Sequence, residues 1–252
     1  MYYSVLALIT GLYLLPVSGY KAQPSPLTMY LIEPHSAISE KWEPIFIKKQ
    51  LQWYTQIIQD APDNNFILIT PESAIPYIPQ SATAEYHAMQ RALQARKSLM
   101  IFGTFTKDKS GMHNSAHYLG TVDTFRHKEK LVAFGEYTPH IPLIHHIASW
   151  FNFPMSTLTP GMKTLSTITF SNHALTSLIC YEIAFPEYVI QRTKNADIVF
   201  VISDDTWFRN SSALSQHQQL TRFYAKALQK TFVFVNNNGG STAYLPGGSI
   251  LT

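Results

Sequence analysis

Cysteine is almost absent from this sequence, since Cys180 is the only one among 252 residues. A single cysteine excludes an internal disulfide framework and a zinc site built from several cysteines. Cys180 is therefore either an inert buried thiol or a reactive one.

An excess of charge of one sign is also absent. The chain has 19 lysines and arginines against 16 acidic residues, and its basic residues are scattered along the sequence. We therefore expect no nucleic-acid partner. The ten histidines show no HExxH spacing, and the GxGxxG, GxSxG and P-loop signatures are missing. We accordingly expect no metal and no cofactor.

Hydrophobic residues make up 46% of the chain and aromatic residues 13%. This composition excludes disordered, collagen-like and low-complexity classes. It is sufficient for a sizeable core in one domain. The sequence shows no internal repeat and no second soluble domain.

The N-terminal segment is uncharged. Residues 2–20 read YYSVLALITGLYLLPVSGY and are followed by Lys21. A helix of ~19 residues, rising ~1.5 Å per residue, just spans a hydrocarbon core of about 30 Å. We predict a transmembrane segment at 1–20, a linker at 21–26 and the main domain at 27–252. A cleaved signal and a buried helix are the alternatives.

After the linker, short apolar runs alternate with amphipathic stretches, which predicts an α/β fold. The expected strands are 27–32, 66–70, 99–106, 115–119, 123–128, 165–170, 174–180, 198–203 and 232–236. The expected helices are 42–60, 82–95, 185–192 and 212–230. Periodicity places one apolar face of the last helix inward, formed by Leu220, Phe223, Tyr224, Ala227 and Leu228.

Three chemically capable residues each follow the carboxyl end of an apolar strand. They are Glu72, Lys128 and Cys180. In open α/β sheets, chemistry collects in the crevice at those strand ends, so the three side chains can converge on one site. A carboxylate can act as general base for the thiol, and a lysine can neutralise the oxyanion formed at a carbonyl. Together they provide what acyl transfer requires.

Each residue also has an ordinary structural interpretation. Cys180 could be a small core residue, Glu72 a carboxylate at a helix start, and Lys128 a solvated surface lysine. Hydrophobic periodicity does not fix the order of strands in a sheet, so the pattern leaves these alternatives open.

Six motifs resemble the carbon–nitrogen hydrolase (nitrilase) superfamily, and most closely its apolipoprotein N-acyltransferase branch. The resemblance covers nearly everything from Leu27 to the end of the chain, with the motifs in the family's order. The motifs are ITPESAIPYIP (69–79), HKEKLVAFGEYTP (127–139), LICYEIAFPE (178–187), SDDTWF (203–208), QHQQLTRFYAKAL (216–228) and NNNGGSTAY (236–244).

The resemblance implies an α-β-β-α sandwich and a catalytic triad of Glu72, Lys128 and Cys180. In that assignment Glu72 moves protons, Cys180 carries the acyl group as a thioester, and Lys128 stabilises the oxyanion. Tyr181 would add a backbone N–H to the oxyanion hole. Glu136 and Glu182 match further acidic positions of the branch, either as substrate-positioning groups or as a supporting carboxylate pair.

The resemblance also implies partners and a location. Members of the branch take an acyl chain from a membrane phospholipid and pass it to the N-terminal amine of a lipoprotein. We therefore expect a phospholipid donor, a lipoprotein acceptor and a place in the bacterial inner membrane, with the domain facing the periplasm. Lys21 alone would weakly favour the cytoplasmic side. The family continues beyond the NNNGGSTAY region, so the C-terminal part of the domain is expected to be missing.

Other functions use the same residues. A soluble amidase of the superfamily would combine the same triad with water and hydrolyse a small amide. A conjugal-transfer relative of the acyltransferase branch is a second alternative. A truncated, catalytically silent relative acting as a binding or scaffold fragment is a third. Trp207 and Phe208 either wall a substrate pocket or belong to an aromatic core.

Overall fold

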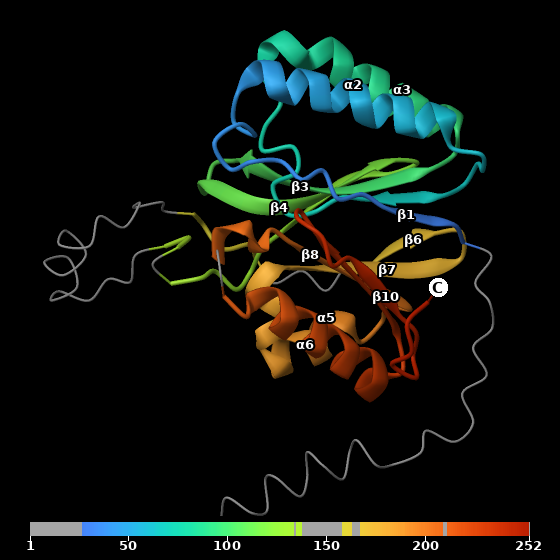
Figure 1. The fold of residues 1–252 in the computed structure, drawn as a ribbon, viewed down its shortest axis with the longest axis vertical. Coiled ribbons are helices and arrows are strands. Elements are labelled where there is room, and N and C mark those ends of the chain that lie inside the picture. The colour runs from blue at the N-terminus through green and yellow to red at the C-terminus, as the bar shows by residue number, and fades with distance from the viewer. Residues whose placement is uncertain (1–26, 134, 138–157, 163–166, 209–210, 252) are drawn as a thin grey trace, which may run out of the picture.

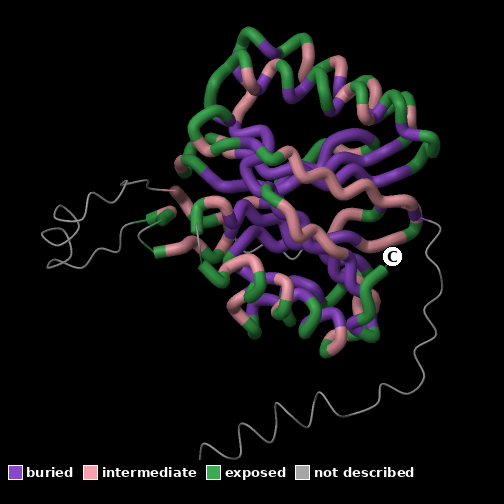
Figure 2. The backbone as a smooth tube through the Cα atoms, viewed as in Figure 1, coloured by how far each residue is buried: buried purple, intermediate pink, exposed green. Residues whose placement is uncertain are grey.

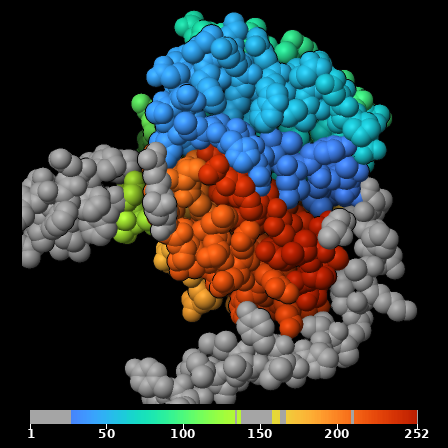
Figure 3. Space-filling view, viewed as in Figure 1, coloured from blue at the N-terminus to red at the C-terminus, as the bar shows by residue number. Residues whose placement is uncertain are grey.

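The computed structural model describes residues 27–133, 135–137, 158–162, 167–208 and 211–251. Within these ranges, two five-stranded sheets pack face to face and helices cover their outer faces (Figure 1). The earlier part of the described chain forms one half of the sandwich and the later part forms the other (Figure 3). The expected α-β-β-α layering is confirmed.

The first sheet has the strand order β1-β2-β3-β4-β5. Its first three strands pair in parallel, and β4 and β5 continue the sheet antiparallel. The strands are β1 (Met29–Leu31), β2 (Ile67–Ile69), β3 (Leu99–Lys107), β4 (Met112–Gly120) and β5 (Asp123–His127).

The second sheet has the order β10-β9-β8-β7-β6. Its central strands β7, β8 and β9 pair in parallel, and the outer strands pair antiparallel. Its central strand is buried throughout, as expected for the continuous apolar run IVFVI that precedes Ser203. The strands are β6 (Ile168–Phe170), β7 (His173–Ile179), β8 (Ile198–Ser203), β9 (Thr231–Asn236) and β10 (Thr242–Tyr244).

In the described part of the chain, helices cover the outer face of each sheet (Figure 1). The first sheet carries α2 (Pro44–Asp60) and α3 (Thr83–Ala95), and the second carries α5 (Pro186–Thr193) and α6 (Ala213–Leu228). Each layer of helices has its own apolar core against its sheet. Short 3₁₀ helices stand at η1 (Gln80–Ala82), η2 (Cys180–Ala184) and η3 (Asp205–Phe208).

A third core lies between the sheets and holds them together. It combines residues of β2, β3 and β4 with residues of β7, β8 and β9, and most of them are fully buried (Figure 2). Tyr118 Oη donates a hydrogen bond to Ser177 Oγ at 2.8 Å across this core. The packing of the two sheets therefore fixes the position of β7 relative to β4.

The thirteen expected helices and strands are present, with bounds that differ by up to three residues. The three-residue strand β10 was not predicted. The inward face of α6 was predicted incorrectly at two positions, because Phe223 and Ala227 are exposed while His217 and Thr221 are buried. His217 Nδ1 lies 3.4 Å from Ser203 Oγ at the end of β8, and Thr221 donates its hydroxyl to the backbone carbonyl of His217 at 2.6 Å. Hydrophobic periodicity does not report the burial of such polar residues.

The predicted transmembrane segment at 1–20 and the linker at 21–26 lie outside the described residues. Among the residues that are described, no helix combines the length and the apolar character needed to cross a bilayer.

Candidate active site

The two sheets bring the three predicted residues to one place. Glu72 follows β2, Lys128 follows β5, and Cys180 follows β7 as the first residue of η2. The chain segment carrying Glu72 lies directly against Gly103 of β3, where an added Cβ would stand 2.4 Å from Glu72 Cα. Glycine is therefore required at position 103 for the backbone of Glu72 to pack against β3.

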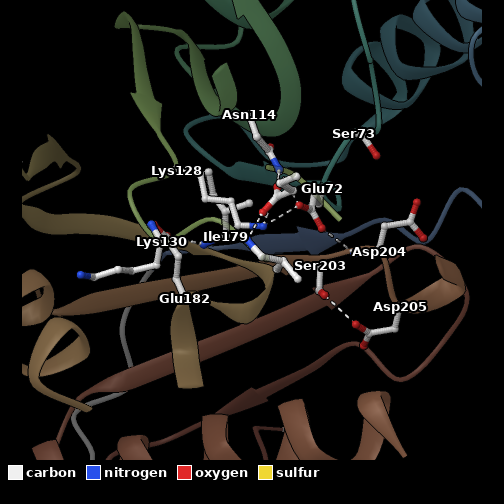
Figure 4. A network of polar contacts seen from close by, with 12 residues as sticks. Glu72, Ser73, Asn114, Lys128, Lys130, Ile179, Glu182, Ser203, Asp204 and Asp205 are labelled. Atoms are coloured by element: carbon white, nitrogen blue, oxygen red, sulfur yellow. Dashed lines mark hydrogen bonds and ion pairs between the residues drawn. The ribbon is translucent and has the colours of Figure 1, made fainter. Parts of the chain in front are cut away.

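Lys128 is held between two carboxylates. Its Nζ donates to Glu136 Oε1 at 2.9 Å. It also donates to Glu72 Oε1 at 3.3 Å (Figure 4). Asn114 of β4 donates its amide to the same two oxygens, at 2.7 Å to Glu72 and 2.9 Å to Glu136. Glu136 Oε2 accepts from the backbone N–H of Val132 at 2.8 Å. The lysine and both carboxylates are thereby fixed by several bonds each.

This network is nearly closed to solvent. Lys128 is 1% exposed and Glu72 is 8% exposed. Burial by itself would lower the pKa of Lys128, but the neighbouring Glu72, Cys180 and Glu136 raise it overall. The lysine therefore remains an ammonium ion at any physiological pH, which an oxyanion-stabilising group requires.

Cys180 is buried and conformationally strained. It has φ 52°, in the left-handed region that a non-glycine residue occupies at a cost of about 1–3 kcal/mol. Burial and the charge of Glu72 raise the pKa of the thiol, whereas Lys128 and a hydrogen bond with Ser203 act in the opposite direction. The resting group is consequently a thiol, and it needs a proton acceptor before it can attack a carbonyl.

A second buried lysine supports Glu72 from the other side. Lys41 is 1% exposed, donates to Ser73 Oγ at 2.6 Å, and forms an ion pair with Asp204. The backbone N–H of Asp204 in turn donates to Glu72 Oε2 at 3.3 Å. The sequence analysis missed Lys41, which lies in a polar stretch just before α2. The available signal was its partner Asp204, which belongs to the SDDTWF motif.

A third polar group lies beside Cys180 on the second sheet. Asp205 Oδ1 accepts from Ser203 Oγ at 2.7 Å and lies 2.8 Å from His217 Nδ1. The thiol of Cys180, a carboxylate oxygen of Asp205 and a ring nitrogen of His217 all lie within 4.8 Å of one another. Both new residues belong to quoted motifs, but the sequence analysis gave them no role.

Glu182 occupies a different environment from Glu136. It is fully buried, pairs with Arg126 at 2.6 Å, and accepts backbone N–H bonds from Ile179 at 2.9 Å and Glu129 at 2.7 Å. Burial alone would raise the pKa of Glu182, but Arg126 and the backbone donors lower it overall. The geometry thus favours the supporting interpretation for Glu182, which fastens the turn at Cys180 to the segment after Lys128.

The remaining predicted side chains lie at the surface. Tyr181 directly follows Cys180 and is 45% exposed, with its ring against Phe185. Trp207 and Phe208 are 54% and 40% exposed, so an aromatic core is excluded for them. Both line a cavity of about 810 Å³ together with His35, Ser36, Asp205 and Asn236. The cavity's lining does not include Glu72, Lys128 or Cys180, and Asp205 connects it to the thiol.

Known proteins share the sequence pattern and the fold of this chain. Residues 44–252 match the model of the carbon-nitrogen hydrolase family. The chain is 30% identical over 268 residues to the apolipoprotein N-acyltransferase of Haemophilus influenzae, covering 98% of this chain and 51% of that protein. It is 31% identical over 210 residues to that of Pasteurella multocida, covering 79% of this chain and 40% of that protein. The chain thus spans about half the length of these relatives.

Solved structures show the same fold at low identity. An amidase from Nesterenkonia sp. superposes with a TM-score of 0.58 at 16% identity, covering 93% of this chain and 88% of that one. A variant of that amidase carries the acetamide moiety of fluoroacetamide on its active-site cysteine. The glutamine-dependent NAD⁺ synthetase of Acinetobacter baumannii superposes with a TM-score of 0.57 at 21% identity, covering 89% of this chain and 42% of that one.

Proposed function

Because the chain belongs to the carbon–nitrogen hydrolase family, we propose that it transfers an acyl group through a thioester on Cys180. The observation that carries this proposal is the buried lysine held between two carboxylates beside a strained, buried cysteine. A buried charge network of this kind is costly to maintain for stability alone, and perturbed ionisable groups of this sort cluster at catalytic sites.

In the first half-reaction Glu72 accepts the thiol proton as the sulfur attacks the ester carbonyl of the donor. Lys128 and the backbone N–H of Tyr181 stabilise the oxyanion. Collapse of the tetrahedral intermediate expels an alkoxide, which takes the proton from Glu72 and leaves as an alcohol. The products are a thioester on Cys180 and a donor lacking one acyl chain.

In the second half-reaction an amine attacks the thioester carbonyl. Glu72 takes the proton of the amine and returns one to the departing sulfur, which regenerates the thiol and releases an amide. Glu136 holds Lys128 in place in both steps. The support for this role is the 2.9 Å contact of Glu136 with Lys128 Nζ and the hydrogen bond that Glu136 accepts from the backbone N–H of Val132.

We further propose a phospholipid as donor and the N-terminal amine of a lipoprotein as acceptor. The support is the similarity to proteins named apolipoprotein N-acyltransferase along nearly the whole of this chain. Such a donor resides in a bilayer, which agrees with the uncharged segment at 2–20. The proposed location is the inner membrane, with the domain on the periplasmic side.

Hydrolysis of a small amide is the second candidate. It is supported by the amidase fold neighbour, which covers 93% of this chain. The two activities share the thioester but differ in the donor, which is a phospholipid ester for the acyltransferase and a small amide for the amidase. They also differ in the second nucleophile, because an amidase uses water where the acyltransferase uses an amine. Donor and acceptor together therefore decide between them.

The test is acylation of the full chain in detergent, followed by mass spectrometry of the intact protein. Incubation with phospholipid should add one acyl chain to the wild type and none to Cys180→Ser. Addition of a diacylglyceryl-cysteine peptide should then transfer the acyl chain to the peptide, so that the protein loses the mass of one acyl chain and the peptide gains it. Release of free fatty acid, with no acylated peptide, would favour hydrolysis. An adduct of equal yield on Cys180→Ser would refute the thioester.

The location has its own test. A cysteine placed at the exposed Lys109, in a Cys180→Ala background, is treated with a membrane-impermeant thiol reagent in cells whose outer membrane is opened. Labelling before the inner membrane is lysed is expected for a periplasmic domain. Labelling only after lysis would contradict the orientation, and release by carbonate washing would contradict the anchor.

A further inference from the structure

A cluster of three potential metal ligands lies on the second sheet's side of the active site. Cys180 begins η2 after β7, Asp205 begins η3 after β8, and His217 lies on α6. The three residues are buried, and their ligand atoms lie within 4.8 Å of one another. Figure 4 shows Asp205 and Ser203 at the ends of the second sheet, away from Asn114 of the first.

One atom of this cluster lacks a partner. Asp205 Oδ1 is engaged by Ser203 and His217, but Oδ2 is buried and has no hydrogen-bond partner among the described residues. Asp205 as a whole is 8% exposed. A buried carboxylate oxygen without a partner destabilises the folded protein. A cation at this point would remove that destabilisation.

The donor set indicates which cations fit. A thiolate, an imidazole and a carboxylate are ligands for Zn²⁺ and similar borderline or soft ions, whereas Mg²⁺ and Ca²⁺ prefer oxygen ligands alone. Zinc bonds of about 2.3 Å to sulfur and 2.0–2.2 Å to nitrogen and oxygen place ligand atoms about 3.3–3.6 Å apart. These separations fall within the 4.8 Å that encloses the three ligand atoms, and the pair Asp205 Oδ1 and His217 Nδ1, now 2.8 Å apart, would move slightly apart to admit the ion. Three protein ligands would leave one position open to water.

Access to the cluster begins at Asp205, which lines the cavity of about 810 Å³ together with Ser36 and Asn236. A hydrated ion can enter this space and reach Asp205. Side-chain movement would then bring Cys180 and His217, which do not line the cavity, into contact with the ion. Binding would replace the proton of the Cys180 thiol, which is released to solvent, and would use a neutral His217. No electron is transferred in this step.

We propose that Cys180, Asp205 and His217 bind a thiophilic divalent cation of the Zn²⁺ class, and that the bound ion blocks the nucleophilic sulfur. The binding does not depend on the proposed function, whereas the inhibition rests on it. The occupied site is a resting state of the enzyme, because a sulfur bound to the metal cannot attack a carbonyl.

The binding test uses Cd²⁺, whose bond to a thiolate absorbs in the ultraviolet. Titration of the full chain should give a one-to-one absorbance change that is absent in Cys180→Ser. His217→Gln and Asp205→Asn should each weaken binding about tenfold or more. His87→Gln, at an exposed histidine of α3, is the matched control and should bind as the wild type.

Unfolding in urea shows whether each variant is folded, and the wild type provides a test without mutation. Zn²⁺ should slow alkylation of Cys180 by iodoacetamide, and Mg²⁺ at the same concentration should not. Unchanged Cd²⁺ affinity in both His217→Gln and Asp205→Asn would reduce the site to a lone thiol and overturn the proposal, as would the absence of any thiolate absorbance. Cd²⁺ binding in a protein that forms no thioester would refute the proposed function and retain the metal site.

Discussion

Replacement of Lys128 by methionine tests the network most directly. Its Nζ lies 2.9 Å from Glu136 and 3.3 Å from Glu72, and its side chain is 1% exposed. At an effective dielectric constant of ~20, each contact is worth about 5 kcal/mol of Coulomb attraction, before the cost of desolvation is subtracted. Removing one partner of a buried pair costs about 3–5 kcal/mol. We expect urea unfolding of Lys128→Met to show a loss of that size.

The chemistry should fail as well. Thioester formation should slow by about 10²-fold or more, because one oxyanion donor is lost. Lys128 is also a group that lowers the pKa of Cys180, so alkylation by iodoacetamide should slow in the variant. Lys130→Met is the matched control, since Lys130 is exposed and its ammonium lies 5.8 Å from the Phe185 ring.

A second variant separates the two effects. Lys128→Met combined with Glu136→Gln removes one of the carboxylates left without a cation, so part of the lost stability should return while thioester formation stays slow. Equal effects of Lys128→Met and Lys130→Met on thioester formation would show that the wrong lysine has been chosen. Recovery of the reaction in the double variant would show that Lys128 acts only through stability.

Three further predictions concern the surroundings of the thiol. Glu72→Gln should speed alkylation of Cys180, because the charge of Glu72 raises the pKa of the thiol. The same change should abolish thioester formation, because the general base is lost. Alkylation and thioester formation that change in the same direction would contradict these roles. Gly103→Ala, whose Cβ would lie 2.3 Å from Ser73 N, should destabilise the protein and slow acylation, whereas Gly247→Ala, with nothing within 4 Å, should do neither. The pKa of Glu182 is lowered in the folded state, so its stabilising contribution is present above the unfolded pKa of about 4.3 and is lost as pH falls through the folded pKa. Glu182→Gln should therefore flatten the acid side of a curve of unfolding free energy against pH. An unchanged slope would contradict the pairing with Arg126.

The strand ends were predictable from sequence because apolar runs are strong local signals. The run at 198–203 matches β8 residue for residue, and Cys180 follows β7 as expected. Strand β10 was not predictable, because a Thr-Ala-Tyr tripeptide after Gly-Gly-Ser is too short to show a periodicity. Propensity and pattern report burial of apolar groups, and they are silent on which polar side chains a tertiary contact will bury.

The polar support of the site shows the same limit. Asn114 and Lys41 are ordinary polar residues in sequence, and their importance arises from contacts to Glu72 and Asp204 made across long separations. Glu182 was grouped with Glu136, but the 3₁₀ turn after Cys180 directs it to Arg126. Contacts made in the folded chain, to Lys128 and Val132 for Glu136 and to Arg126 and Ile179 for Glu182, decide which of the two carboxylates faces the lysine.

The site depends on both sheets, because Glu72 and Lys128 come from the first and Cys180 from the second. Tyr118→Phe removes the bond to Ser177 that crosses the core between them and leaves the buried Ser177 hydroxyl without that donor. The expected loss is about 1–3 kcal/mol of unfolding free energy. Removing both polar groups in Tyr118→Phe with Ser177→Ala should cost less than the two single changes together, because no buried group is then left unsatisfied. Thioester formation by the folded fraction should stay near the wild-type rate, since the bond lies outside the network around Lys128. A loss of thioester formation at unchanged stability would show instead that this bond positions Cys180 directly.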